Sequence, residues 1–249
     1  MSKLFQLVLL LLLGISCSVF GQGQSSDKIK VYISGNKENN TPSTSSGTVS
    51  GGTLINGKLF PFQGTNYQYF DTTSYINNRA FLNDKIRTVV IASYKHLEKE
   101  IPDRKFFIME CSNKNGGKIF PHRTHQNGLS IDFMMPLVKG NKVFYGLDTI
   151  GSSHYWLDFD NEGKYSGDKS ISIDFDLVAQ QILSLETSAR NNGYKIQKVI
   201  IKTEFKSLIF ATPHGKKLKQ SNIYLVNSLT PLINSLHDDH FHIDFEILK

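Results

Sequence analysis

The stretch His240-Phe241-His242-Ile243-Asp244-Phe245-Glu246-Ile247, near the end of the chain, alternates strictly between polar and apolar residues. Successive side chains of a β-strand point to opposite faces of a sheet, so residues two apart share a face. The apolar set predicts a strand with one face buried against helices. The two imidazoles, of His240 and His242, therefore project together from the opposite, polar face.

A second stretch, from His122 to Asp132, holds further imidazole and carboxylate groups. The sequence from Gly128 to Met134 also alternates, which places Asp132 on the polar face of its own strand, and His125 lies in the loop before it. With His237, three residues before the first stretch, five of the eight histidines fall in two windows that are over a hundred residues apart. If the two strands are neighbours in one sheet, their imidazoles meet the Asp132 carboxylate in one cleft.

This combination of residues favours a zinc site. Two imidazoles and a carboxylate can hold zinc and leave a fourth position open for water. Imidazole ligands also favour zinc over magnesium or calcium. Only Cys111 remains once a leader containing Cys17 is removed, so a site built from thiolates is excluded. The HExxH helix of thermolysin-like enzymes is absent.

The remaining periodicity predicts an α+β fold with a central, largely antiparallel sheet and flanking helices. Apolar residues at helical spacing predict helices over 77–100 and 174–192. Strands are expected over 105–111, 128–134, 198–205 and 240–248, with helical turns through much of 207–236. His96, His154 and His214 are interpreted as surface or turn residues.

Residues 1–21 are predicted to form a secretory signal peptide. Lys3 precedes an apolar run, Leu4–Leu13, and small residues lead to a cleavage site before Gln22. The run is shorter than the ~20 residues of a membrane span, so no stable span is expected after its removal. Lipid attachment at Cys17 is the alternative. The expected location is secreted, in a bacterial periplasm or at the cell surface.

Residues 22–52 are predicted to be a polar, low-complexity segment or linker, followed by one domain over 53–249. Its Ser- and Thr-rich part, 41–47, has the composition of a solvated linker, and Lys28–Ser34 is a candidate edge strand. The formal charge of +6 suits an anionic polymer, although scattered surface lysines explain it equally well. No basic cluster interleaved with aromatic residues indicates nucleic-acid binding.

Several motifs resemble the penicillin-insensitive murein endopeptidases, which belong to the LAS group of zinc peptidases together with D-Ala-D-Ala carboxypeptidases. They are Gly51-Gly52-Thr53-Leu54-Ile55-Asn56-Gly57, Gly117, His122-x2-His125-Gln126-x-Gly128-Leu129-x-Ile131-Asp132 and His237-Asp238-Asp239-His240-Phe241-His242. The resemblance runs from about Gly51 to about Phe245. It implies a LAS-like fold in which His125, Asp132 and His242 hold one zinc ion per chain.

The same resemblance implies that His240 is the base that helps to activate water, with His237 assisting. The activity implied is hydrolysis of D-alanyl–diaminopimelate cross-links in peptidoglycan. The alternatives are a carboxypeptidase acting on stem peptides and a non-catalytic, wall-binding module. Asp238, Asp239 and Asp244 are candidates to orient imidazole N–H groups around the metal.

The sequence also departs from the pattern of this family. Ser130 stands where an acidic residue is usual, and Thr124 where serine is usual. In some relatives the histidine at the position of His122 binds a second metal together with a downstream Asp-x2-His. No convincing downstream pair is present, so His122 is interpreted as a residue of the substrate cleft and a second metal is doubtful.

Overall fold

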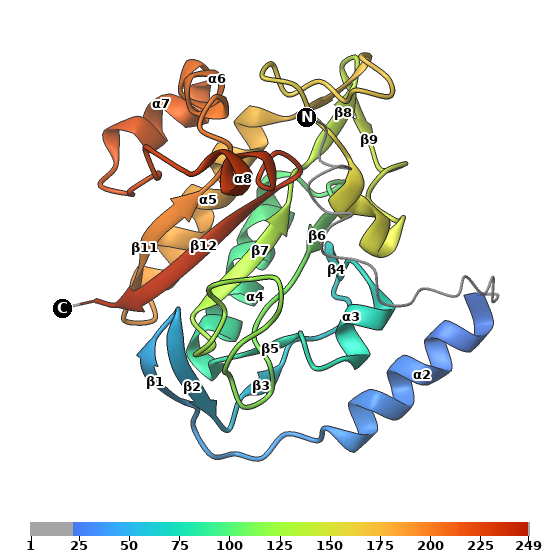
Figure 1. Cartoon of the computed structure of the whole chain (residues 1–249), viewed down its shortest axis with the longest axis vertical. Coiled ribbons are helices and arrows are strands. Elements are labelled where there is room, and N and C mark those ends of the chain that lie inside the picture. Colours follow the sequence, from blue (N-terminus) through green and yellow to red (C-terminus); the bar gives the residue numbers. More distant parts are fainter. Residues whose placement is uncertain (1–21, 249) are drawn as a thin grey trace.

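A five-stranded sheet forms the centre of the computed structural model, which describes residues 22–248 (Figure 1). The predicted signal peptide, residues 1–21, lies outside the described residues. The strand order is β11-β12-β7-β6-β4, and only the β4–β6 pair is parallel. The strands are β11 (Tyr194–Ile200), β12 (His240–Ile247), β7 (Ser130–Met134), β6 (Phe106–Ile108) and β4 (Tyr67–Tyr69). The chain is thus a mixed α/β protein, consistent with the predicted α+β class.

The two strands that carry the histidine and aspartate motifs are direct neighbours. β12 pairs with β7 in antiparallel register, with His242 opposite Asp132 and Asp244 opposite Ser130. On the other face, Phe133 stacks on Phe241 with ring centroids 5.3 Å apart. Burial of these apolar side chains fixes the register, because a slip by one residue would turn the apolar set to the polar side.

Helices α4 (Asp84–Glu100) and α5 (Phe175–Arg190) pack against each other behind this sheet in Figure 1. Asp174 caps α5 by accepting a hydrogen bond from the Leu177 N–H. The helix predicted over 77–100 begins later, at Asp84, with Asn83 as its N-cap. The cause is that Phe81 and Leu82 form a strand instead, β5 (Phe81–Leu82), which pairs with β3 (Lys58–Leu59).

The prediction of an edge strand over Lys28–Ser34 is wrong, because this stretch lies within helix α2 (Gln22–Gly35). Ile29 and Tyr32, three residues apart, are the side chains that face the domain, whereas Val31 is exposed. The Tyr32 ring packs edge-on against Tyr75 at 5.7 Å, and its hydroxyl donates to Asn78 Oδ1. Contacts at helical spacing therefore outweigh the alternating pattern of the sequence.

The linker expected over 22–52 also contains a hairpin, formed by β1 (Thr44–Thr48) and β2 (Gly51–Ile55). The Val49 carbonyl accepts a hydrogen bond from the Gln126 N–H, and Ser45 Oγ accepts one from Asn83 Nδ2. These bonds hold the polar hairpin against the body of the domain. Composition alone did not reveal them, because serine and threonine suit solvated linkers and hydrogen-bonded strands alike.

The remaining elements surround the sheet. The strand predicted over 198–205 ends at Ile200, and α6 begins at Phe205, while the helical turns expected over 207–236 are present as short helices. These elements are α3 (Thr72–Ile76), β8 (Leu137–Lys139), β9 (Lys142–Phe144), the 3-10 helix η1 (Gly151–Trp156), β10 (Ile171–Ile173), α6 (Phe205–Ala211), α7 (Pro213–Gln220) and α8 (Pro231–Ser235). Within residues 22–248, no helix combines the length and apolar character that a membrane crossing requires.

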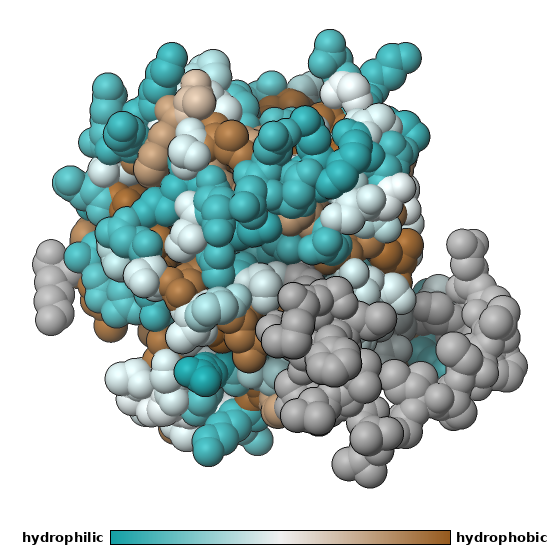
Figure 2. All heavy atoms as spheres, turned by 45° about the horizontal axis from the view of Figure 1, so that its top comes forward, coloured by the Kyte–Doolittle hydropathy of each residue, from teal (hydrophilic) through white to brown (hydrophobic). Residues whose placement is uncertain are grey.

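Polar residues cover most of the face seen in Figure 2, and hydrophobic side chains appear there in separate patches. A hollow of about 690 Å³ lies between α2 and the segment from Leu59 to Gln63. It shares no residue with the histidine and aspartate motifs. The hollow is therefore not where their chemistry would take place.

Asp148 is a buried carboxyl whose titration should be visible in the stability of the fold. It is 2% exposed, and its Oδ1 has no hydrogen-bond partner among the described residues. Burial raises the pKa of Asp148 to about 7, against a smaller lowering by Arg104. An unfolded Asp ionises near pH 4, so the folded state is penalised increasingly as the pH rises from about 4 through 7.

Asp148→Asn is therefore expected to stabilise the protein at pH 8 and to change little at pH 4. The gain at pH 8 is at most about 4 kcal/mol, from the separation of the folded and unfolded pKa values. Urea unfolding of both proteins at several pH values measures it. A stability difference that does not vary with pH would contradict the burial of an uncompensated carboxyl.

Candidate metal centre

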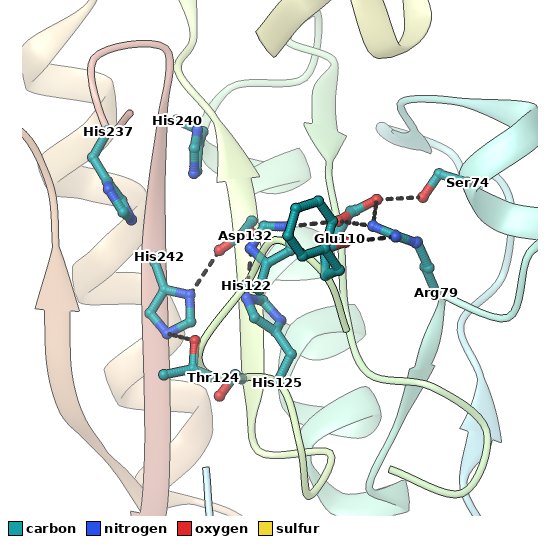
Figure 3. Close-up of polar contacts among 12 residues, drawn as sticks. Ser74, Arg79, Glu110, His122, Thr124, His125, Asp132, His237, His240 and His242 are labelled. Carbon is teal, nitrogen blue, oxygen red and sulfur yellow. Dashed lines mark hydrogen bonds and ion pairs between the residues drawn. The ribbon is translucent and has the colours of Figure 1, made fainter. Parts of the chain in front are cut away.

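The Asp132 carboxylate is the centre of a buried group of imidazoles. It is 1% exposed, and its Oδ1 accepts a hydrogen bond from Nδ1 of His242 at 2.7 Å. The pairing of β7 with β12 fixes this contact, since the two residues are directly opposite each other. The predicted meeting of the two motifs is therefore present in the structure (Figure 3).

His125 reaches the same carboxylate from the loop that precedes β7. Its side chain is fully buried, and its Nε2 lies 3.3 Å from Asp132 Oδ2. The backbone of His125 adopts a left-handed conformation with φ of 66°, which costs a non-glycine residue on the order of 1–3 kcal/mol. Surrounding structure must compensate for this cost, and such strain is concentrated at functional sites.

His122 is also part of this group, which the sequence did not predict. Its Nδ1 lies 3.6 Å from Asp132 Oδ2, and its ring is 4.9 Å from that of His125. The side chains of His122, His125 and Asp132 offer ligand atoms that all lie within 4.8 Å of one another. This group could hold a metal ion.

Protonation around the carboxylate differs from one residue to the next. Burial opposes the charge on Asp132, but His125 and His242 hold the pKa of its carboxyl well below the usual range. Burial lowers the pKa of His125, against the attraction of Asp132, and so favours the neutral form that a metal ligand needs. Burial also acts to lower the pKa of His242, but the carboxylates of Asp244 and Asp132 raise it to about 10.

His242 is therefore held as an imidazolium between two carboxylates. Its Nδ1 donates to Asp132, and its Nε2 donates to Asp244 Oδ1, also at 2.7 Å. Thr124 Oγ1 lies 3.5 Å from the same Nε2. Metal binding through Nδ1 would have to release the proton on that nitrogen, as coordination by a protonated ligand always does.

Buried polar atoms without partners provide a test of whether a metal fits here. Both ring nitrogens of His125 and Oδ2 of Asp132 lack a well-directed hydrogen bond among the described residues, although Nε2 and Oδ2 lie close together. An unsatisfied buried polar group costs about 1–3 kcal/mol. A cation between Nε2 of His125 and Oδ2 of Asp132 would satisfy these two atoms, and imidazoles with a carboxylate are donors that suit zinc. The residues present fit the predicted ion.

His240, at the start of β12, and His237, in the turn before it, form a second group beside the first (Figure 3). Nδ1 of His240 donates to Asp239 Oδ1 at 2.5 Å, and the two histidine rings lie 4.9 Å apart. Nδ1 of His237 donates to the Ile233 carbonyl. Burial, assisted by the nearby His240, lowers the pKa of His237 to about 3, so this imidazole is neutral.

No protein-family model matches this chain, and no curated protein matches its sequence.

The carboxylates expected to orient imidazoles occupy different places. Asp239 contacts His240, and Asp244 contacts His242, as the prediction requires. Asp238 accepts a hydrogen bond from the backbone N–H of Phe159 at 3.3 Å, so it supports the adjoining loop. Ser130, the departure from the family pattern, donates to Asp244 Oδ1 and thus takes part in the same buried network.

Glu110 is the main residue of the site that the sequence analysis missed. It is 4% exposed, and its Oε2 lies 2.6 Å from His122 Nε2. Burial works against its charge, but His122 and Arg79 outweigh burial and lower the pKa of the Glu110 carboxyl. The available signal was a single carboxylate inside the apolar run Phe106–Cys111.

The other histidines divide into one buried and two accessible residues. His154 is fully buried, which corrects its expected surface position, and its Nε2 lies 3.2 Å from the Asp239 carbonyl. It therefore supports the backbone beside His240. His96 is exposed near Glu100, as expected for a surface residue. His214 pairs with Asp176 but lies in helix α7 and not in the expected turn, because Thr212 caps a helix that begins at Pro213.

Proposed function

We propose that this protein is a zinc metallopeptidase of the LAS type that hydrolyses D-alanyl–diaminopimelate cross-links of peptidoglycan. The observation that carries the proposal is the convergence of His125, from the loop before β7, with Asp132 and His242 on adjacent strands. His240 lies on the same face of β12 as His242 and pairs with Asp239. The motifs that resemble murein endopeptidases supply the substrate class. With such a substrate, the chain would act outside the cytoplasm, and residues 1–21 would direct its export.

His125, Asp132 and His242 would hold the zinc ion. When bound, the ion would polarise the scissile carbonyl and lower the pKa of a water molecule towards neutrality. The carboxylate of Asp132 would reduce the net charge of the site, and Asp244 would fix the orientation of the His242 ring. His122 stands beside these residues with one nitrogen directed at Asp132.

His240 would transfer the proton in this reaction. Its Nδ1 carries the proton donated to Asp239, which leaves the lone pair on Nε2. Nε2 would take the proton of the attacking water and return it to the leaving amine, a role that imidazole fills near neutral pH. His237, close to the His240 ring, would assist by holding that imidazole in place. No serine nucleophile takes part, so β-lactams are not expected to acylate the enzyme.

Product analysis tests the proposal together with the metal content. Purified protein should contain one zinc per chain and should convert cross-linked muropeptide dimers to monomers, with loss of activity on chelation and recovery on adding zinc. Release of terminal D-alanine alone would establish the carboxypeptidase instead. Stoichiometric zinc without any product from muropeptides would favour the non-catalytic wall-binding module and reject the peptidase.

A further inference from the structure

Glu110 sits at the centre of a buried polar cluster next to the metal group. Its carboxylate accepts hydrogen bonds from His122 Nε2 at 2.6 Å, from Arg79 Nη1 at 2.9 and 2.8 Å, and from Ser74 Oγ at 2.9 Å. Figure 3 shows these three side chains converging on it from separate segments. The imidazole is therefore held by a carboxylate that is itself fixed in orientation.

Arg79 connects this carboxylate to the loop that carries His122. Its Nη2 donates to the Phe120 carbonyl at 2.7 Å, two residues before His122. The position of Arg79 is set by its own carbonyl, which accepts from the Cys111 N–H and from the Tyr69 hydroxyl. One guanidinium thus fixes both the partner of the imidazole and the backbone that carries the imidazole.

This arrangement determines which nitrogen of His122 is available. A nitrogen bound to a carboxylate carries the proton, so the bond to Glu110 assigns the proton to Nε2 and the lone pair to Nδ1. Nδ1 is the atom that faces Asp132 Oδ2, at 3.6 Å. A carboxylate that holds one imidazole nitrogen while the other faces a metal is the usual support of a histidine ligand.

We propose that His122 is a further ligand of the metal held at His125 and Asp132, and that Glu110 and Arg79 are positioning residues for it. With His242 this makes four protein ligands, so the water of the proposed reaction would enter as a fifth, an expansion that zinc allows. The proposal rests on the proposed metal site but not on its peptidase activity. A residue that only lined a substrate cleft would not require a buried carboxylate. Burial of the Glu110 carboxylate carries a desolvation cost that Arg79, whose side chain is 28% exposed, only partly offsets, so this contact is a poor means of stabilising the fold. Orientation of the His122 imidazole accounts for the presence of this buried carboxylate.

Metal binding without substrate tests this assignment. Metal-free wild type, His122→Ala and Glu110→Gln would be titrated with zinc against a chromophoric chelator, and with cobalt to record the visible spectrum. The zinc affinity of Glu110→Gln is expected to fall roughly 10–100-fold, as on removal of residues that orient metal ligands. The loss should be at least as large for His122→Ala, and both cobalt spectra should change.

The control is His96→Ala, an exposed histidine that should bind zinc and cobalt as the wild type does. Thermal unfolding of the metal-free proteins checks that each variant is folded. Should Glu110→Gln fail to fold, Arg79→Lys replaces it. Lysine keeps the positive charge beside Glu110 but lacks the second nitrogen, Nη2, that bonds the Phe120 carbonyl while Nη1 contacts the carboxylate, so this variant should also weaken zinc binding.

Wild-type affinity and an unchanged cobalt spectrum in folded His122→Ala would overturn the proposal. If His122→Ala loses zinc affinity but Glu110→Gln and Arg79→Lys do not, His122 remains a ligand, and the positioning role of Glu110 and Arg79 is overturned. A wild-type protein that binds zinc with these dependences but cleaves no muropeptide would reject the peptidase while leaving His122 as a ligand. The two proposals therefore fail in different measurements.

Discussion

Asp132→Asn is expected to abolish zinc binding and peptidase activity together. Asparagine has nearly the same shape, so its side-chain oxygen can still accept the hydrogen bond from His242 Nδ1. The substitution removes the negative charge on which His122, His125 and His242 converge. A metal site made of imidazoles alone would lose both a ligand of high affinity and the charge that balances the ion.

The loss of zinc affinity should exceed the roughly 10–100-fold expected when only an orienting partner of a ligand is lost. Zinc content after dialysis and a chelator competition measure it, and muropeptide digestion measures activity. Asp168→Asn is a matched control, because Asp168 is a surface carboxylate paired with Lys139. Full zinc occupancy in Asp132→Asn would remove Asp132 from the ligand set and with it the proposed centre.

The half of the site on β12 was predictable because strand periodicity is a local property. Alternation over His240–Ile247 commits His240 and His242 to one face, and β12 presents both from buried positions in the structure. The adjacency of β7 and β12 was only a conditional expectation. Pairing between segments more than a hundred residues apart depends on the whole sheet, and single-residue patterns do not encode it.

Glu110 was missed because its role depends on contacts between separate segments and not on a local pattern of the sequence. It lies twelve residues before His122, and their contact depends on the path of the loop between them. Arg79 adds a third segment, so the cluster exists only in the folded chain. The error at Lys28–Ser34 has another cause, since apolar residues at 29, 31 and 33 suit a strand, whereas the packing of Tyr32 on Tyr75 selects the helix.

His240→Ala is expected to reduce turnover by a factor of about 10²–10⁴ while leaving zinc bound, since positioned proton transfer contributes that much to catalysis. The His240 imidazole contacts Asp239, His237 and Tyr155, and none of the three belongs to the group around Asp132. Its removal should therefore lower kcat and leave zinc affinity within about threefold of the wild type. This separation distinguishes a base from a ligand.

Asp239→Asn provides a graded comparison in the same experiment. The amide side chain would keep a hydrogen-bonding group beside His240 but would lose the charge that holds the proton on Nδ1. Turnover should fall in this variant as well, with zinc still bound, because the lone pair on Nε2 is no longer assured. His96→Ala should match the wild type in both measurements. If His240→Ala loses zinc in proportion to activity, His240 belongs to the ligand set, and another residue must carry the proton.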